Sequence, residues 1–336
     1  QDEPFSIDLS SMLPTAFGSQ KKKTASSDIF SKTRRKDEHE EIKLSTSDQI
    51  AKSKRIKYAH EDNETSHVDR SVSALTLDPA GARLITGSYD YDVKFWDFAG
   101  MDSTFRPFRT IKPCGDHQIH HLEYSLSGDQ FLIISGTAQA KLYDRDGFEI
   151  EEYIKGDPYI RDMRNTNGHI ASLTCGGWHP NDRQTFFTGS ADSTIRIWDV
   201  ENKRKQKHVL VHKSKERGGR SAITAACYSL DSKFLAGGMI EKAHQPHSET
   251  SSIIFSRNNW SMVTRGGDDC VKVWDVRNFK SAVAQAKELP SFNAETNVIF
   301  SPDERMIITG TATKKGEGYG KLVMMDRESL EIVRTM

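Results

Sequence analysis

The sequence predicts an all-β fold, a β-propeller of repeated short strands preceded by an extended arm. Three observations support this prediction. Three twelve-residue segments superimpose without gaps, a second strand-like segment recurs upstream of them, and the composition changes near Ser71. The chain has 336 residues, more than the ~250 at which a single core usually stops growing, and a repetitive fold accommodates that length.

The gapless repeats each end in a Trp-Asp strand, with a further Asp six residues before the Trp. They are GSYDYDVKFWDF (87–98), GSADSTIRIWDV (189–200) and RGGDDCVKVWDV (265–276). Their repeated residues are Trp96, Asp97 and Asp90, then Trp198, Asp199 and Asp192, then Trp274, Asp275 and Asp268. A fourth segment, SGTAQAKLYDRD (135–146), has Tyr143-Asp144 in place of Trp-Asp and Thr137 in place of the turn Asp, so we interpret that unit as degenerate.

The upstream segments alternate apolar and polar residues and end at a Pro, Ser, Asp or Gly turn, as expected for strands. They are VSALTLDPAG (72–81), IHHLEYSLSG (119–128), ITAACYSLDS (223–232), SIIFSRNN (252–259) and NVIFSPDE (297–304). Gly168-His169 precedes the third unit, and Ala243-His244 precedes the fifth. This order of His, strands and Trp-Asp over ~40 residues resembles a blade of the WD40 family, from Ser71 to the C-terminus.

The resemblance implies that the repeated residues stabilise each blade. In WD40 blades the Trp, the turn Asp, the loop His and a strand Ser or Thr form one hydrogen-bonded set. In the third blade this set would be Trp198, Asp192, His169 and either Thr188 or Ser190. A catalytic Ser-His-Asp triad is the alternative, but a triad occurs once, whereas this set recurs in several blades. We therefore expect a protein that is not an enzyme and has no cofactor or small-molecule substrate.

Residues 1–70 predict an extended, mostly irregular basic arm, separate from the propeller at 71–336. Polar and charged residues dominate the arm, and its apolar residues follow no regular period. Between Lys21 and Lys57 there are twelve Lys or Arg and six Asp or Glu. The last basic run, with Lys52, Lys54, Arg55 and Lys57, has the composition of a nuclear-import signal, although such runs are also common in solvated segments.

The composition of the whole chain excludes several classes of partner. The 47 basic and 47 acidic side chains cancel, so no overall field favours nucleic acid or an anionic membrane. The four cysteines lie far apart without a C-x-x-C pair, a pattern typical of a reducing compartment. No stretch approaches ~18 apolar residues, so we expect no membrane partner. RNA contact by the arm would be indirect or non-specific, because the arm lacks interleaved aromatic residues for stacking on bases.

Two local patterns resemble ligand sites, and we assign neither. Cys114, His117, His120 and His121 form a group of soft metal ligands, but His120 and His121 are adjacent in a predicted strand and would point to opposite faces. The glycine-rich stretch at 310–320 lacks the G-x-x-x-x-G-K-[ST] order of a phosphate-binding loop. We therefore predict no metal site and no phosphate site.

One repeat carries an additional motif. Trp274-Asp275-x-Arg277 resembles the short sequence by which many WD40 proteins dock onto the DDB-type adaptor of cullin-RING ubiquitin ligases. Many propellers contain this sequence without docking. Arg277 is the residue to substitute in order to learn whether this motif docks onto the adaptor.

A closer resemblance, carried by 71–102, 140–150, 154–180 and 265–275, is to the WD repeat-containing protein 70 (gastrulation-defective) family. The arm segment 16–35, with its FG dipeptide and its Phe followed by Thr-Arg-Arg, is similar as well. The resemblance implies a nuclear scaffold associated with spliceosomal particles, and also with ubiquitin-ligase-linked histone H2B ubiquitination and DNA repair. The arm residues expected to bind partners are Phe5, Phe17, Phe30, Arg34 and Arg35.

The chain departs from a complete seven-bladed propeller in two places. After LAGGM (235–239), a blade should continue for about 20 residues to a Trp-Asp strand, but IEKAH (240–244) follows directly. The sequence also ends near the expected start of a seventh blade. We therefore expect the fourth blade to be incomplete after Met239, additional residues between Met239 and Ile240 in the natural protein, and a truncated seventh blade.

Overall fold

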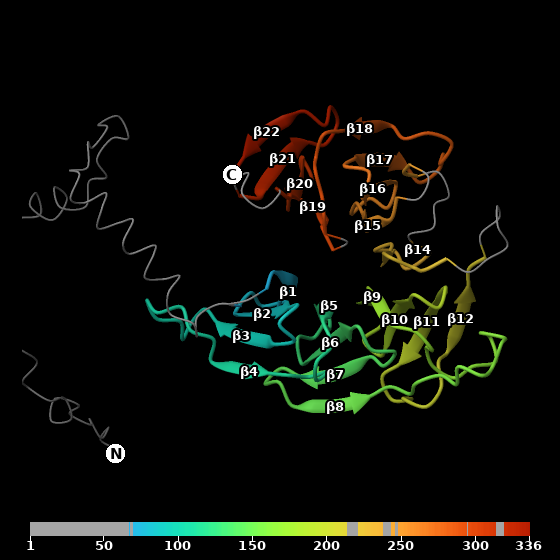
Figure 1. The fold of residues 1–336 in the computed structure, drawn as a ribbon. Coiled ribbons are helices and arrows are strands. Elements are labelled where there is room, and N and C mark those ends of the chain that lie inside the picture. The colour runs from blue at the N-terminus through green and yellow to red at the C-terminus, as the bar shows by residue number, and fades with distance from the viewer. Residues whose placement is uncertain are drawn as a thin grey trace, which may run out of the picture. The chain divides into compact units, whose positions relative to one another are not determined.

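The computed structural model describes residues 67, 70–213, 221–237, 243–245, 248–293, 295–313 and 319–336, and every regular element in these ranges is a β-strand. Within the described ranges, the strands form five four-stranded sheets and one two-stranded sheet (Figure 1). Within each sheet the strands are antiparallel and follow one another in chain order. No helix in the described part of the chain could span a membrane. The prediction of an all-β WD40 propeller is confirmed.

The first three sheets have four strands each. Their bounds are β1 (Val72–Leu77), β2 (Arg83–Ser88), β3 (Val93–Asp97), β4 (Arg109–Ile111); β5 (Ile119–Tyr124), β6 (Gln130–Ser135), β7 (Lys141–Asp144), β8 (Glu149–Glu152); β9 (Leu173–Trp178), β10 (Thr185–Ser190), β11 (Thr194–Asp199), β12 (His208–Val211). In sheets 1, 3 and 5, each gapless repeat of the sequence runs from the last two residues of the second strand, through the turn, to the end of the third strand.

The remaining sheets differ in size. Their bounds are β13 (Ala226–Tyr228), β14 (Leu235–Gly237); β15 (Thr250–Phe255), β16 (Ser261–Gly266), β17 (Val271–Asp275), β18 (Ala284–Ala286); β19 (Val298–Phe300), β20 (Met306–Thr311), β21 (Lys321–Asp326), β22 (Ile332–Thr335). The fourth sheet has only β13 and β14 among the described residues. Met239 and Ile240, where the sequence predicts missing residues, lie outside the described ranges.

The apolar core is divided among the contacts between successive sheets. First strands pack against first strands along the chain, from β1 with β5 to β15 with β19. Five apolar clusters lie between these sheets, one for each successive pair. Phe95 of sheet 1, for example, packs with Phe131 of sheet 2, and Trp178 and Phe186 of sheet 3 pack with Leu132 and Ile134 of sheet 2. Sheets 2 to 5 therefore each share apolar clusters with two neighbours, as expected for radial repetition, whereas sheets 1 and 6 each share a cluster with one neighbour.

Candidate functional site

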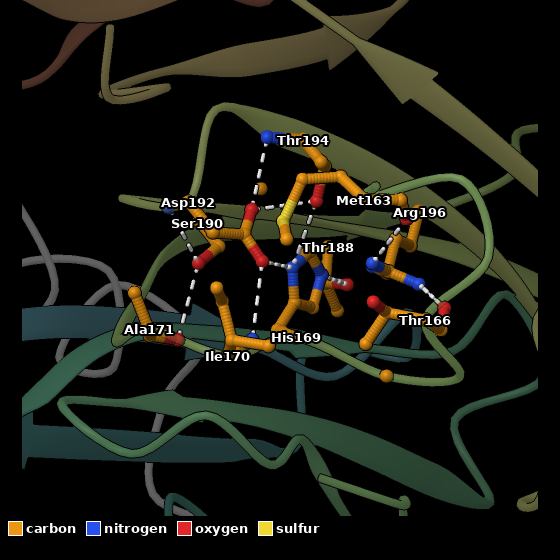
Figure 2. Close-up of polar contacts among 12 residues, drawn as sticks. Met163, Thr166, His169, Ile170, Ala171, Thr188, Ser190, Asp192, Thr194 and Arg196 are labelled. Carbon is orange, nitrogen blue, oxygen red and sulfur yellow. Dashed lines mark hydrogen bonds and ion pairs between the residues drawn. The ribbon is translucent and has the colours of Figure 1, made fainter. Parts of the chain in front are cut away.

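The third sheet carries a buried chain of polar contacts around His169 (Figure 2). The indole Nε1–H of Trp198 donates to Thr188 Oγ1 over 2.8 Å, and Thr188 Oγ1 lies 2.7 Å from His169 Nε2. His169 Nδ1 lies 3.0 Å from Asp192 Oδ2. These four side chains are at most 4% exposed. The alternative between Thr188 and Ser190 is resolved, because Ser190 Oγ instead donates to the carbonyls of Ala171 and Ser172.

The protonation of this set follows from its geometry and burial. Burial lowers the pKa of His169, against the opposing effect of Asp192, so the imidazole is neutral. Burial alone would raise the pKa of Asp192, but hydrogen bonds from His169, Thr194 and the backbone N–H of Ile170 outweigh it and lower that pKa to about 2. The single imidazole proton therefore lies on Nδ1 and points to the carboxylate, while Nε2 accepts from the Thr188 hydroxyl.

The same set recurs in sheets 1 and 5. In sheet 5, Trp274 Nε1 donates to Thr264 Oγ1 over 3.0 Å, and His244 bridges Thr264 and Asp268 over 2.9 and 2.8 Å. Sheet 1 repeats these contacts with Trp96 Nε1 at 3.0 Å from Thr86 Oγ1, and with His67 at 3.0 Å from Thr86 and 2.7 Å from Asp90. The recurrence and the burial leave no exposed nucleophile in these sets, which act in the stability of the fold.

The sequence gives no direct sign of His67, because no Gly-His dipeptide marks it and it precedes the expected propeller start. A spacing signal could have found it. His67 lies 23 residues before Asp90, His169 lies 23 before Asp192, and His244 lies 24 before Asp268. The threonines are equally regular, each ten residues before its tryptophan.

The second residue of each Trp-Asp pair has a different task. Asp97, Asp199 and Asp275 each accept a hydrogen bond from the backbone N–H two residues further on, at 3.1, 3.1 and 2.9 Å. This contact closes the turn after the third strand of the sheet. These aspartates therefore shape the turn and are not part of the buried sets.

Sheet 2 is degenerate in the way its sequence indicates. Thr137, in the turn-Asp position, contacts Ser135 Oγ at 3.0 Å and donates to the carbonyl of Gln139 at 2.9 Å. Tyr143, in the Trp position, donates its hydroxyl proton to Glu149 at 2.9 Å. Local contacts thus replace the His-Thr-Trp chain in this sheet.

A buried cation lies next to the set, at a position that the sequence does not single out. Arg196, two residues before Trp198, is 0% exposed, and its guanidinium donates to the carbonyls of Thr166 at 2.5 Å and Met163 at 3.0 Å (Figure 2). Lys272, two residues before Trp274, donates to the carbonyl of Ala243 at 2.6 Å. In both sheets the cation binds backbone carbonyls of the segment that leads to the histidine of the set. The sequence does not indicate this role, because a charged residue at this position of a strand is usually exposed to solvent.

His120 and His121, which belong to the group of possible metal ligands in the sequence, contact different partners. His120 Nδ1 contacts Glu295 Oε1, whereas His121 Nε2 lies 3.8 Å from Glu123 Oε2. Burial lowers the pKa of His120 and raises the pKa of Glu295 to about 7. Within the described ranges, no group of three His, Cys, Asp or Glu residues has the geometry to hold a metal ion.

Arg277 of the docking motif lies on the surface. Its side chain is 64% exposed, and its Nε and Nη2 atoms donate to the Asp275 carboxylate over 3.0 and 2.8 Å. The guanidinium carbon also lies 4.8 Å from the centre of the Trp260 ring, and Trp260 is 59% exposed. Trp274 of the same motif is buried in its polar set, so Arg277 and Trp260 are the groups that a partner could reach. The arm residues Phe5, Phe17, Phe30, Arg34, Arg35, Lys52, Lys54, Arg55 and Lys57 lie outside the described residues.

Comparison with known proteins supports the repeat assignment. The WD40 family (WD domain, G-beta repeat) matches residues 61–97 and 161–199. WD repeat-containing protein 70 of Bos taurus is 46% identical over 287 residues, which cover 80% of this chain and 44% of the relative. The gastrulation defective protein 1 homolog of Drosophila melanogaster is 42% identical over 302 residues, which cover 84% of this chain and 46% of the relative.

A more distant relative is covered to a similar extent. An uncharacterized WD repeat-containing protein of Schizosaccharomyces pombe is 33% identical over 297 residues, covering 79% of this chain and 51% of that protein. The chain therefore spans about half the length of the curated relatives it matches.

Proposed function

Since the chain belongs to the WD repeat-containing protein 70 family of WD40 propellers, we propose that it is a non-catalytic scaffold subunit of a large nuclear assembly, the spliceosome. The observation that supports this most directly is that the His, Thr, Asp and Trp residues of each set bond to one another. All three sets are used internally, and those of sheets 3 and 5 are almost fully buried, so they stabilise the sheets and offer no reacting group to solvent. WD40 propellers generally bind other proteins, and a rigid propeller offers its loops and edges for that purpose.

The basic arm is the second element of the proposal. Its charge, its phenylalanines and its lack of a hydrophobic period suit a segment that orders on a partner. The run Lys52, Lys54, Arg55 and Lys57 supports import into the nucleus.

The test is a purification from nuclear extract of the chain with and without residues 1–60, followed by identification of the co-purifying proteins and RNA. This truncation keeps His67 and its contacts with Thr86 and Asp90. Spliceosomal proteins should accompany the full chain and be lost on truncation. Recovery of the same proteins by a propeller whose internal sets are disrupted, or their absence with the full chain, would contradict the scaffold role. Replacing the four basic residues at 52–57 with alanine should move a fluorescent fusion from the nucleus to the cytoplasm.

A second function is favoured by the surface position of Arg277. An exposed arginine stacked on an exposed tryptophan has the composition of an interface hot spot. It supports a role as substrate receptor or adaptor of a cullin-RING ubiquitin ligase, acting in histone H2B ubiquitination and DNA repair.

The two functions are separated by a pull-down with the DDB-type adaptor. Arg277→Ala should abolish capture of the adaptor, because it removes the cation and uncovers Trp260. Arg305→Ala is the matched control, since Arg305 is 86% exposed and likewise lies beside an aspartate two residues earlier. If both variants, or neither, lose the adaptor, the ligase role through this motif is excluded.

A further inference from the structure

The connection between β8 and β9 contains a closed loop with a glycine neck. Gly156 N–H donates to the carbonyl of His169 over 2.8 Å. Gly168 has a φ of +93°, and a Cβ on it would lie 2.2 Å from the carbonyl oxygen of Ile154. The two ends of residues 157–167 therefore touch, which is the geometry of an Ω-loop, a class of loop that is frequently functional.

Buried side chains hold the base of this loop. Arg196 donates to the carbonyls of Thr166 and Met163 (Figure 2). Gln206, which is 8% exposed, donates to the Thr166 carbonyl over 2.9 Å and accepts from Gly168 N–H over 3.1 Å. A partner that bound this loop would find its base already ordered, so little conformational entropy would be lost on binding.

The tip of the loop presents an aromatic ring to solvent. Tyr159 is 92% exposed, which leaves both faces of the ring accessible. Its position is fixed by its backbone, because Tyr159 N–H donates to Asp157 Oδ1 over 2.9 Å and Ile160 N–H to the Asp157 carbonyl over 3.3 Å. Tyrosine is usually more covered than this in a folded domain, and an aromatic ring held open in this way suits stacking on a ligand.

The surroundings of the loop are strongly basic, although the chain as a whole is neutral. Residues 155–168 and the adjoining segment 201–213 contain eight Lys or Arg and three Asp or Glu. The two segments are in contact, because Ile154 N–H donates to the carbonyl of Lys203 over 3.1 Å and Gln206 binds the loop base. Lys155, Arg161, Arg164, Arg204 and Lys205 are all exposed. Lys203 and Lys207 pair with Glu151 and Asp199, which lie outside these segments. The remaining local excess of three positive charges favours a polyanion.

We infer that the Ω-loop 157–167, with the adjoining turn at 203–207, binds single-stranded nucleic acid, with Tyr159 stacking on an unpaired base and the surrounding cations contacting phosphates. A duplex is disfavoured, since its bases are stacked on one another and a ring on a convex loop cannot reach their faces. An acidic protein surface could pair with the cations around the loop, but it offers no planar base on which the Tyr159 ring could stack. The inference goes beyond the scaffold role and does not depend on it.

Fluorescence anisotropy with a labelled 12-nucleotide oligo(U) RNA and a matched oligo(dT) DNA tests this on the full chain. Tyr159→Ala should weaken binding about 5- to 150-fold, the range expected for one stacked base. Tyr319→Ala is the matched control, because Tyr319 is also 92% exposed and lies on the β20–β21 connection. Tyr159→Phe keeps the ring and should bind as tightly as the parent chain. Since the Tyr159 side chain is almost fully exposed, both variants should retain the parent's melting temperature.

The salt dependence gives a second readout. Arg161→Gln combined with Arg164→Gln should reduce the slope of log affinity against log salt by about 1.4, that is, about 0.7 for each phosphate that the chain no longer neutralises. Tighter binding of oligo(U) than of oligo(dT) identifies RNA as the source of the ligand, and equal binding identifies a site for either strand. Both results support the inference.

Three outcomes would overturn it. These are no measurable binding of either oligonucleotide, equal losses in Tyr159→Ala and Tyr319→Ala, and a 12-residue poly-glutamate probe that binds as tightly as the RNA and loses affinity to the same extent in Tyr159→Ala. The last result would assign the loop to an acidic protein instead.

Discussion

The hydroxyl of Thr188 lies between Trp198 and His169, accepting from the indole and donating to the imidazole. Trp198 and His169 are both buried. The indole Nε1 of Trp198 and the imidazole Nε2 of His169 therefore both depend on the Thr188 hydroxyl for a hydrogen bond. The same relationship holds for Thr264 between Trp274 and His244.

Thr188→Val should lower the free energy of unfolding by about 2–4 kcal/mol, because it leaves two buried nitrogens without a partner at nearly constant side-chain volume. Urea unfolding followed by circular dichroism measures the change. Thr110→Val, at an exposed position of β4, should alter stability by less than ~0.5 kcal/mol. Equal effects of the two substitutions would contradict the role of the buried set.

The carboxylate of Asp192 predicts a pH-dependent effect. Its folded pKa of about 2 lies below its ordinary value of 3.8, so the charged carboxylate contributes stability above pH ~4, and that contribution is lost as the pH falls through about 2. The difference in pKa corresponds to about 2 kcal/mol. Asp192→Asn should therefore be most destabilising at pH 7 and progressively less so below pH 4, as measured by urea unfolding at several pH values. A cost that grows on acidification would refute this assignment.

The glycine neck predicts a backbone effect. Gly168→Ala should destabilise the chain by roughly 3 kcal/mol or more, because it combines a positive φ with a contact at 2.2 Å to a backbone oxygen that cannot move freely. Gly310→Ala is the control, since no atom lies within 4 Å of its added Cβ. Thermal unfolding compares the two, and an unchanged melting temperature in Gly168→Ala would show that the neck is not needed.

The fourth sheet, which has two strands among the described residues, predicts additional residues in the natural protein. The 287 positions aligned with the Bos taurus relative correspond to 80% of the 336 residues, about 269 of them, so about 18 positions of the relative have no counterpart in this chain. An apolar cavity of about 500 Å³ lies beside β14, with Phe234, Phe255 and Phe279 in its lining. The cavity lies where the strands expected between Met239 and Ile240 would pack, and the number of unmatched positions is close to their expected length of about 20 residues.

Sequencing the natural transcript across this point should reveal about 20 further codons. Inserting the corresponding segment of the Bos taurus relative should raise the melting temperature by several degrees, because two strands would cover the cavity. A glycine-serine insert of the same length should not. A transcript in which Met239 and Ile240 are adjacent would contradict the prediction.

The sequence predicted the parts of the fold that depend on local periodicity. The Trp-Asp strands and their turn aspartates were visible because a blade repeats its pattern at a nearly fixed interval, and Trp198, Asp192 and His169 meet as expected. The choice between Thr188 and Ser190 stayed open, because two residues of the same parity on one strand face the same side, and only the structure shows which hydroxyl reaches the imidazole.

The remaining features depend on contacts between segments that no local pattern encodes. Arg196 has the pattern of an ordinary charged residue of a strand, although it is fully buried against backbone carbonyls 30 and 33 residues earlier. Gly156 and Gly168 have the pattern of loop glycines, and their close approach is visible only when both ends of the loop are seen. His67 precedes the region whose periodicity defined the propeller, so its pairing with Asp90 could be found only by counting back from that residue.

Each of the five apolar clusters is shared by two successive sheets, so no sheet has a core of its own. Cutting the chain between any two sheets therefore exposes two complementary apolar surfaces, one on each fragment. Because these surfaces are complementary, two fragments produced separately should reassociate along the face at which they were divided. We therefore expect that a split pair of fragments, each fused to one of two partners, would report by its reassembly that the partners have come together.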